Sequence, residues 1–349
     1  MKNVFHILNT GNFSGAEHVV LTIIQLENDV EHVYVSPDGP ISEVLSKHNI
    51  KHLKISKLSY LNLKKIIKFE KPDVVHAHDF KASILASLLS RVIHKQKGII
   101  VSHLHKNDPQ VKKISLKSIL YAISLLFIDK TLVVSKAVID EYVFHGLLKR
   151  KALVLGNVVE TKKIVSEAQK YKLDKFDISY IARISDEKNP ERCIKIIKMV
   201  KHYLPNIKVC WVGSGDLEAQ MREKIISENL SENIDMVGFK TNPYPYIFNS
   251  KIGILTSKWE GFGLGVLESM LMSKPIVATP VGGLPKLVNS QNGILSDDDN
   301  VLVREIVELL SDEEYYKKKS VASRLKATKL NDINRYQRTL QIAYDIPLK

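Results

Sequence analysis

Two glutamates stand eight residues apart around a glycine-rich segment, Glu260–Glu268 (E-G-F-G-L-G-V-L-E). An apolar run at 252–255 precedes it and apolar residues at helical spacing follow, so the pattern predicts a strand, a turn and a helix. The backbone can approach a ligand closely at the glycines of the turn, Gly261, Gly263 and Gly265. Amides at the start of the helix would bind an anion, most simply a phosphate, with a carboxylate on either side. An ordinary glycine-rich turn with two solvated glutamates fits this stretch equally well.

Two cations, Arg183 and Lys188, follow another apolar run at 177–182. Arginine offers a bidentate fork and lysine a point charge, so the pair is suited to binding a diphosphate. Such a clamp stabilises the charge that develops on a departing diphosphate without a metal ion. Each residue alone is compatible with an ordinary surface loop, but their combination with the glycine turn favours the clamp.

The first predicted strand, 4–8, runs into the loop Asn9–Glu17 and then a helix that begins near His18. The loop lacks the G-x-G-x-x-G spacing of dinucleotide-binding proteins, which argues against a dehydrogenase. Gly15, in a Gly-Ala-Glu sequence at the start of the helix, can bring a backbone amide to a phosphate or a sugar.

Histidines follow two further predicted strands, as His76 and His78 and as His103 and His105. Either His103 or His105 is a candidate to face Glu260 and bind a sugar hydroxyl or the attacked centre, although a histidine at a strand end is more often structural. His76 and His78 are alternatively zinc ligands, but no cysteine, aspartate or glutamate has matching spacing. We therefore expect no metal site.

Composition restricts the class of protein. The chain has 349 residues, of which 44% are hydrophobic, enough for two domains with large cores. The two cysteines form neither a disulfide framework nor a metal motif, which fits a reducing compartment. No apolar run approaches the ~18 residues of a membrane span, and the N-terminal residues resemble a first strand rather than a signal peptide.

The net charge of +13 leaves three classes of partner open: nucleic acid, an anionic membrane and anionic small substrates. Nucleic acid is disfavoured because zinc-finger spacing, RNP aromatics and a basic tail are absent. Residues 85–151 contain twelve Lys or Arg and four Asp or Glu, and within them 114–121 predicts a basic amphipathic helix. This pattern favours peripheral contact with an anionic membrane over an ordinary lysine-rich surface helix.

Strands alternate with helices along the chain, which predicts an α/β protein with parallel sheets. The lysine-rich stretch 161–175 is the expected hinge. The predicted domains are therefore an acceptor-binding domain at 1–160, a nucleotide-sugar-binding domain at 176–330 and a C-terminal helix at 331–349.

Taken together, these motifs resemble the retaining nucleotide-sugar glycosyltransferases of family 4, which have the GT-B fold. The resemblance covers nearly the whole chain. It is carried by the segments E-x7-E at 260–268, ESMLMSKPIVATPVGGLPKLV from 268, ARISDEKNP from 182, VGSGD from 212, VGFKTN from 237, SGAE from 14, DVVHAHD from 73 and VSKAVIDEY from 134. Ser14 replaces the first glycine of the family's Gly-Gly-Ala-Glu.

The resemblance implies two Rossmann-like domains facing across a cleft, with the C-terminal helix crossing back to the first. Glu260, His105, Arg183 and Lys188 would be the catalytic residues. The donor would be bound by Gly15, Arg183, Lys188, Gly213, Phe239, Gly263, Leu264, Gly265 and Glu268. Glu268 would hold the ribose and Glu260 the transferred sugar, while His103 and His78 are possible acceptor or sugar contacts.

The activity implied is a hexosyltransferase reaction that retains configuration and needs no metal or other cofactor. The donor would be a nucleotide-diphosphate sugar and the acceptor a glycan or a lipid-linked sugar of a surface polysaccharide. The expected location is the cytoplasm or the inner face of the cell membrane. A nucleotide-sugar epimerase or hydrolase of the same fold and a non-catalytic nucleotide-sugar-binding module remain alternatives.

Overall fold

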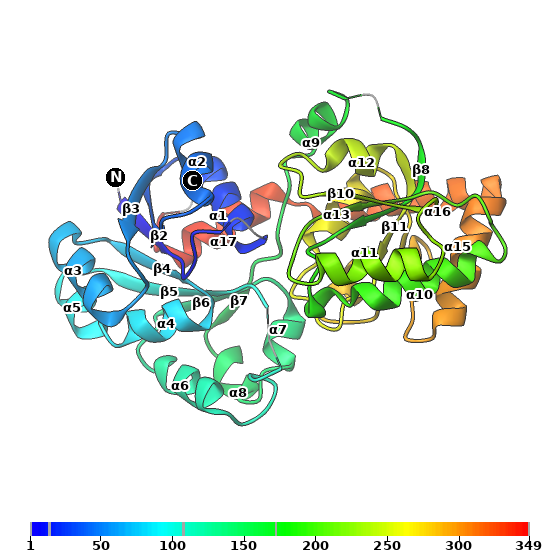
Figure 1. The fold of residues 1–349 in the computed structure, drawn as a ribbon. Coiled ribbons are helices and arrows are strands. Elements are labelled where there is room, and N and C mark those ends of the chain that lie inside the picture. The colour runs from blue at the N-terminus through cyan, green and yellow to red at the C-terminus, as the bar shows by residue number, and fades with distance from the viewer. Residues whose placement is uncertain (1, 13–14, 107–108, 172, 348–349) are drawn as a thin grey trace. The chain divides into compact units, whose positions relative to one another are not determined.

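The computed structural model describes residues 2–12, 15–106, 109–171 and 173–347, so Ser14 of the SGAE motif lies outside the described residues. The chain divides into two compact units, each built on one parallel sheet (Figure 1). The first unit comprises Met1–Val158 and Ile333–Lys349, and the second comprises Val159–Asp332.

Seven parallel strands form the sheet of the first unit in the order β3-β2-β1-β4-β5-β6-β7. They are β1 (Lys2–Ile7), β2 (Val30–Pro37), β3 (Lys51–Ile55), β4 (Val74–His78), β5 (Ile99–Leu104), β6 (Lys130–Val133) and β7 (Ala152–Val154). The central strands are buried along most of their length, because helices cover both faces of the sheet.

The helices of the first unit are α1 (Gly15–Leu26), α2 (Ile41–Lys47), α3 (Tyr60–Glu70), α4 (Asp79–Ser87), α5 (Ser90–Lys95), α6 (Leu116–Ser124), α7 (Lys136–Asp140), α8 (His145–Lys149) and α17 (Ile333–Ala343). One face of the sheet packs against α1 and α17, in a core that includes Val4, Val74 and Leu340. Helices α4 and α5 lie on the opposite face (Figure 1).

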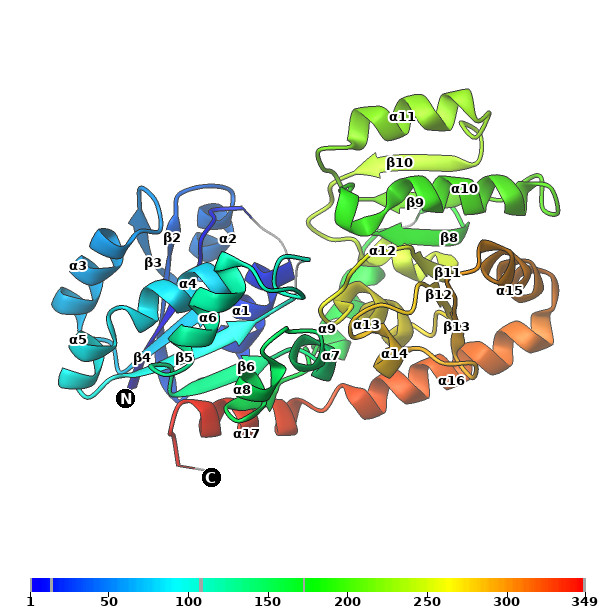
Figure 2. The same cartoon turned by 90° about the horizontal axis from the view of Figure 1, so that it is seen from below.

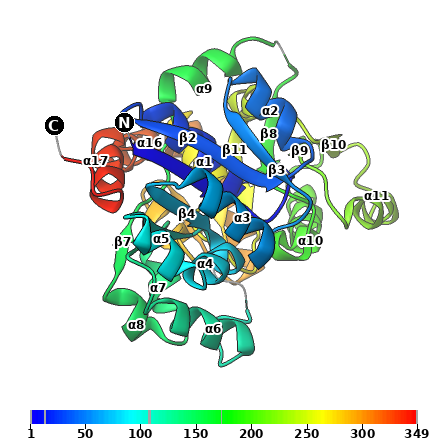
Figure 3. The same ribbon diagram turned by 90° about the vertical axis from the view of Figure 1, so that its left-hand side faces the viewer.

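Helix α17, red in Figure 3, belongs to the first unit although it comes last in the chain. Its buried residues Tyr336, Leu340 and Ala343 join those of β1, β4, β5 and β6 in one hydrophobic core. The C-terminal segment therefore completes a domain that begins at the N-terminus.

Six parallel strands form the sheet of the second unit in the order β10-β9-β8-β11-β12-β13 (Figure 2). They are β8 (Phe176–Ile181), β9 (Val209–Val212), β10 (Ile234–Gly238), β11 (Ser250–Leu255), β12 (Ile276–Ala278) and β13 (Gly293–Leu295). Their core packs around Trp211 and Tyr180 against α10 and α15.

The helices of the second unit are α9 (Thr161–Ala168), η1 (Asp186–Lys188), α10 (Pro190–Lys201), α11 (Glu218–Ser227), α12 (Tyr244–Phe248), α13 (Leu264–Leu271), α14 (Leu284–Leu287), α15 (Asp299–Ser311) and α16 (Glu313–Leu330).

The structure differs from the expected elements at three places. Part of the expected hinge, 161–175, forms α9, which packs against α12 and belongs to the second unit. The sequence 81–93 predicts a single helix, but the structure has two, α4 and α5, because the backbone leaves helical geometry at Leu89 (φ −101°, ψ 6°). Strand β3 and helix α3 were not expected, although the buried residues of α3, Leu63 and Ile67, stand at helical spacing.

Candidate functional site

The glycine turn of the second unit leads from β11 into α13 (Leu264–Leu271). Gly263 precedes the helix in the left-handed conformation (φ +93°), and a Cβ there would lie 2.5 Å from Leu284 Cδ2. The fold itself therefore requires glycine at 263. A Cβ at Gly265 would make only an ordinary 3.5 Å contact with the Ile181 carbonyl oxygen, so the protein does not require that glycine. The first amides of α13 have no acceptor within the helix and can bind an anion.

Lys188 and Glu260 form an ion pair, with 2.5 Å between Nζ and Oε2, and both side chains are largely buried. The backbone of Lys188 is fixed because its carbonyl oxygen accepts hydrogen bonds from Tyr180 Oη and Thr256 Oγ1. A cation and a carboxylate, which the sequence separates by 72 residues, are thus in direct contact at this site.

Arg183 lies just after β8 and is 54% exposed. Its Nη2 is 3.2 Å from Oε2 of Glu187, and Glu187 Oε1 is also 3.6 Å from Lys188 Nζ. One carboxylate therefore holds both predicted diphosphate ligands near each other. The motif search passed over Glu187, although it lies between the two cations in the sequence.

Glu268 is buried in the first turns of α13, and Tyr244 Oη donates a hydrogen bond of 3.2 Å to its Oε1. Burial raises the pKa of this carboxyl to about 7, and the bond from Tyr244 opposes that rise. The site therefore contains a carboxyl group that changes charge near neutral pH. Sequence reasoning missed Tyr244, because a tyrosine in a helix of five residues carries no recognisable signal.

Gly213 and Phe239 follow β9 and β10 at the same edge of the sheet, because all six strands are parallel. A Cβ at Gly213 (φ +148°) would lie 2.0 Å from the Ala182 carbonyl oxygen, so this glycine permits close packing after β8. The Phe239 ring is exposed and can stack on a planar ligand.

The arrangement in the second unit can therefore bind a charged, multipart ligand. Two cations, the amides of a helix N-terminus and two carboxylates all lie at the carboxyl ends of β8 and β11 or the start of α13, where ligands bind in open parallel sheets. The cations suit a diphosphate and the carboxylates suit hydroxyl groups.

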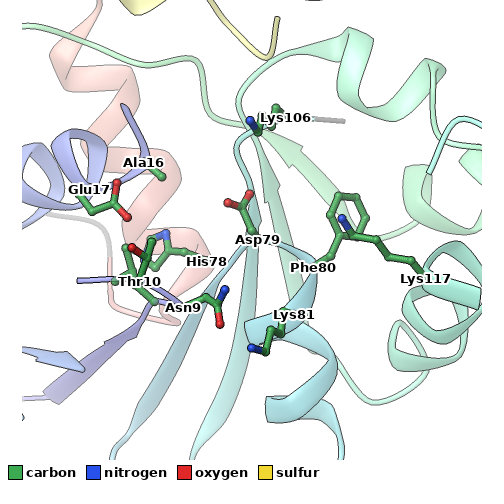
Figure 4. A pocket seen from close by; sticks show the side chains of 11 residues that line it. Asn9, Thr10, Ala16, Glu17, His78, Asp79, Phe80, Lys81, Lys106 and Lys117 are labelled. Atoms are coloured by element: carbon green, nitrogen blue, oxygen red, sulfur yellow. The ribbon is translucent and has the colours of Figure 1, made fainter. Parts of the chain in front are cut away.

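The first unit contains its own cavity of about 230 Å³ (Figure 4). Loops at the carboxyl ends of β1, β4 and β5 and the helices that follow them line it. The lining residues are Leu8, Asn9, Thr10, Ala16, Glu17, His78, Asp79, Phe80, Lys81, Lys106 and Lys117. Three lysines and two carboxylates, those of Glu17 and Asp79, line the cavity, so it offers charged groups of both signs to a polar ligand. Gly15 is the exposed first residue of α1, and a Cβ there would meet no protein atom within 4 Å.

His105 is partly exposed, whereas His103 is completely buried within β5. His105 is held by two contacts, one from its ring Nε2 to His78 Nδ1 (2.9 Å) and one from its backbone N–H to Asp79 Oδ1 (3.2 Å). Burial lowers the pKa of His105, and the negative charge of Asp79 opposes this shift. The ring is therefore neutral at physiological pH and has one nitrogen that can accept a proton.

Helix α6 has an unusual distribution of side chains. Its buried positions are Ser118, Tyr121 and Ser124, and apolar residues occupy its exposed side. The exposed apolar residues of α6 and its flanks are Ile114, Leu116, Ile119, Leu120, Ile123, Leu126 and Phe127, which we call the α6 apolar surface. Among the described residues, no helix has both the length and the apolar character needed to cross a membrane.

The sequence matches two related protein families that together span most of its length. Residues 160–326 match Glycosyl transferases group 1, and residues 14–163 match Glycosyltransferase Family 4. An uncharacterized glycosyltransferase of Methanocaldococcus jannaschii is 30% identical over 284 residues, which are 77% of this chain and 76% of that protein. The chain therefore belongs to the group 1, family 4 glycosyltransferases, and it is an enzyme of that class.

Two further comparisons concern a relative and a solved structure. CapH of Staphylococcus aureus, a capsular polysaccharide biosynthesis glycosyltransferase, is 26% identical over 77% of this chain and 79% of its own. The structure of Alr3699/HepE from Anabaena in complex with UDP and glucose matches 99% of this chain and 100% of that chain, with a TM-score of 0.86 and 18% identity. The fold is GT-B, as the sequence resemblance implied.

Proposed function

We propose that this protein transfers a sugar, with retention of configuration, from a nucleotide-diphosphate sugar to a growing surface polysaccharide. The observation that carries the proposal is the cluster of Arg183, Lys188, Glu260 and Glu268 around the glycine turn of the second unit. The solved complex of HepE with UDP and glucose supports a UDP-sugar donor, and the name of CapH supports a polysaccharide product.

Each group has a chemical role in this proposal. Glu268 accepts hydrogen bonds from the ribose hydroxyls, Phe239 and Gly213 lie on the side of the base, and Arg183 and Lys188 bind the diphosphate. The amides of Leu264 and Gly265 add hydrogen bonds to the phosphate oxygens, and Gly15 leaves room for a phosphate or a sugar at the start of its own helix, α1.

Transfer itself proceeds without a metal ion, because the two cations and the helix amides stabilise the negative charge that develops on the leaving diphosphate. Glu260, which is paired with Lys188, contacts the sugar. The departing diphosphate oxygen takes the proton of the acceptor hydroxyl, which attacks on the face that the diphosphate leaves. His105 orients the sugar, with His103 and His78 behind it in the first unit.

The acceptor side of the proposal concerns the first unit. Lys81, Lys106 and Lys117 line its cavity together with two carboxylates, and the three lysines suit the phosphate of a lipid-linked acceptor. Lys117 belongs to α6, whose apolar surface would lie on an anionic membrane while the exposed Lys113 contacts the head groups; the neighbouring Lys112 already pairs with Glu141 (2.9 Å).

Calorimetry with a panel of nucleotide sugars and free nucleotides tests the donor site. We expect one nucleoside diphosphate to bind, and Glu268→Ala and Arg183→Ala to weaken it at least about tenfold, the loss of a charge-assisted hydrogen bond. Arg222→Ala is the matched control, since Arg222 is 50% exposed and also pairs with a glutamate four residues away. Unchanged affinity in Arg183→Ala and Glu268→Ala would contradict the assignment. Turnover of donor without acceptor would instead indicate a hydrolase or an epimerase.

Co-sedimentation with vesicles of anionic lipid tests the membrane contact. Leu116→Asp should reduce the bound fraction strongly, because a charge on the α6 apolar surface opposes burial in lipid. Leu61→Asp is the control, since Leu61 is exposed to the same extent (74% against 75%) but lies on α3. An equal decrease in the bound fraction of both variants would show that α6 is not the membrane-binding element.

A further inference from the structure

Six histidines lie on the face of the first sheet that packs against α1 and α17. They are His6, His32, His76, His78, His103 and His105. Each is two or four residues after a valine of the core on that face, namely Val4, Val30, Val74 or Val101, so they share the face by the two-residue period of a strand. Strands β2, β1, β4 and β5 are consecutive neighbours, which makes the six rings one contiguous layer.

A chain of hydrogen bonds orders four of these rings. His32 Nε2 donates to the Glu27 carbonyl oxygen (2.8 Å), which only accepts, so neutral His32 accepts at Nδ1 from His6 Nε2 (3.0 Å). His6 then accepts at Nδ1 from His78 Nε2 (3.1 Å), and His78 accepts at Nδ1 from His105 Nε2 (2.9 Å). One carbonyl group thus fixes the tautomers along the chain.

His76 lies beside these four hydrogen-bonded rings, and only one of its two ring nitrogens has a hydrogen-bond partner among the described residues. Its Nδ1 is 2.8 Å from Tyr344 Oη, from the segment that follows α17. Its Nε2 is fully buried and has no hydrogen-bond partner among the described residues. Leaving a buried ring nitrogen unpaired is unfavourable by about 1–3 kcal/mol, so the position calls for an explanation.

We propose that His6, His76 and His78 form a zinc-binding site. One ring nitrogen of each lies within 4.8 Å of the others, and His6 Nδ1 and His78 Nε2 are already 3.1 Å apart. Tetrahedral ligands at the usual Zn–N distance of about 2.0–2.1 Å are separated by about 3.3 Å. The His6–His78 pair needs only a small expansion to reach that spacing, and the nitrogen of His76, within 4.8 Å of both, moves toward them. Three imidazole nitrogens, with a fourth position for water, form a well-known type of zinc coordination.

The second nitrogen of every proposed ligand is held by another group. His6 Nε2 bonds to His32, His76 Nδ1 to Tyr344 and His78 Nδ1 to His105. Outer partners of this kind orient the ring and are typical of metal-ligating histidines.

Besides this movement of the ligands, binding requires a rearrangement of protons along the hydrogen-bonded rings. The proton between His78 Nε2 and His6 Nδ1 gives way to the ion, and His78 carries its proton on Nδ1 instead. His105 then accepts at Nε2 and carries its own proton on Nδ1, so every ring stays neutral and no proton leaves the protein. Of the three proposed ligands, His78 lines the cavity of the first unit (Figure 4), so an ion would reach the site past its ring.

A second triad, His78, His103 and His105, also has nitrogens within 4.8 Å of one another. It is the weaker candidate, because neither nitrogen of His103 has a hydrogen-bond partner among the described residues to orient its ring. The two triads share His78 and therefore exclude each other, which lets variants separate them.

The test uses the full chain without a polyhistidine tag. After removal of metal by a chelator, Zn²⁺ is added back and measured by mass spectrometry and by competition with a chromophoric zinc indicator. We expect one ion per chain and a rise in melting temperature that the chelator reverses. His6→Gln and His76→Gln should each weaken binding at least about 100-fold, more than the loss of an outer partner.

His103→Gln is the matched control, because His103 is as buried as the ligands but belongs only to the second triad. It should bind Zn²⁺ like the wild type. Tyr344→Phe keeps all three ligands and should weaken binding about 10–100-fold, which tests the site even where a ligand variant fails to fold. The proposal is overturned by no uptake in the wild type, or by binding that depends on His103 and not on His6. These readouts are independent of sugar transfer.

Discussion

The carboxyl group of Glu268 connects burial to donor binding at the scale of one residue. Burial raises its pKa to about 7, and only its ionised form accepts two hydrogen bonds from a ribose. Donor affinity should therefore be constant above about pH 8 and fall by up to about tenfold per pH unit below 7. Calorimetry between pH 6 and pH 8.5 measures this. In Glu268→Gln the dependence should disappear, and a dependence that persists in this variant would assign it to another group.

The ionised form of Glu268 that binds the donor should also lower the stability of the folded protein. The pKa of Glu268 is higher in the folded protein than its ordinary value of 4.5, so its contribution to stability is full below pH 4.5 and is lost as pH rises through 7. Glu268→Gln should raise the free energy of unfolding at pH 8 by up to roughly 3 kcal/mol and change it little at pH 5. Urea denaturation at the two pH values tests this. An equal effect at both would show that charge is not the cause.

Two glycines of one turn should respond differently to alanine. Gly263→Ala strains a left-handed backbone and meets Leu284, which should cost at least about 1–2 kcal/mol of stability. Gly265→Ala meets no obstacle and should leave stability unchanged or raise it by up to about 1 kcal/mol, yet weaken donor binding through its methyl group. Melting temperature and donor affinity separate the two effects. Normal donor affinity in Gly265→Ala would show that no ligand lies against that residue.

Motif spacing identified the candidate residues but not their partners. Arg183, Lys188, Glu260 and Glu268 could all be chosen from the sequence, because each stands at a fixed distance from a glycine turn or a strand end. Glu187 and Tyr244 could not, since their importance depends on which side chains the fold brings beside them. These site assignments stay predictions until a ligand is bound.

At the scale of an element, helix α6 also shows what the sequence predicts and what only the fold determines. A basic amphipathic helix was predicted from 114–121, and the structure places α6 at Leu116–Ser124, where Lys117 is its one charged residue. The sequence could not show that its serines face inward and its leucines outward, because helical periodicity identifies two faces without saying which one is buried.

The cap of α6 should matter more than other serine caps in this protein. Ser115 and Ser118 form a reciprocal capping box, whereas Ser59 caps α3 through one bond of 3.4 Å. Ser115→Ala should lower the protection of the α6 amides from hydrogen exchange and destabilise the first unit by about 0.5–2 kcal/mol. Ser59→Ala should have a smaller effect on α3. The reverse order would mean that packing, not capping, holds α6.

At the scale of the whole molecule, two doubly wound units were predictable because strands and helices alternate along the entire chain. The order of the strands was not. Neighbours such as β1 and β4 are far apart in sequence, so nothing in the local spacing placed His6 beside His76 and His78. A third histidine beside His76 and His78 becomes evident only from the order of the strands in the folded sheet.

The division into units predicts separate effects of two buried leucines. Leu340 of α17 belongs to the core of the first unit and Leu309 of α15 to that of the second, and both are essentially inaccessible to solvent. Truncation to alanine should cost about 2–5 kcal/mol in each case. In scanning calorimetry Leu340→Ala should lower the transition of the first unit and Leu309→Ala that of the second. A shift of both transitions by either variant would show that the units unfold as one.

Helix α17 also sets the order of events during synthesis. The residues of the second unit leave the ribosome before Ile333, so that unit can fold while the first still lacks part of its core. Until Tyr344 arrives, one face of the first sheet is incompletely covered and His76 lacks its hydrogen-bond partner. In a nascent chain halted before α17, the apolar residues of the first sheet would therefore be the most exposed to solvent, although they were synthesised first. Chaperones would bind to that sheet rather than to the residues synthesised last.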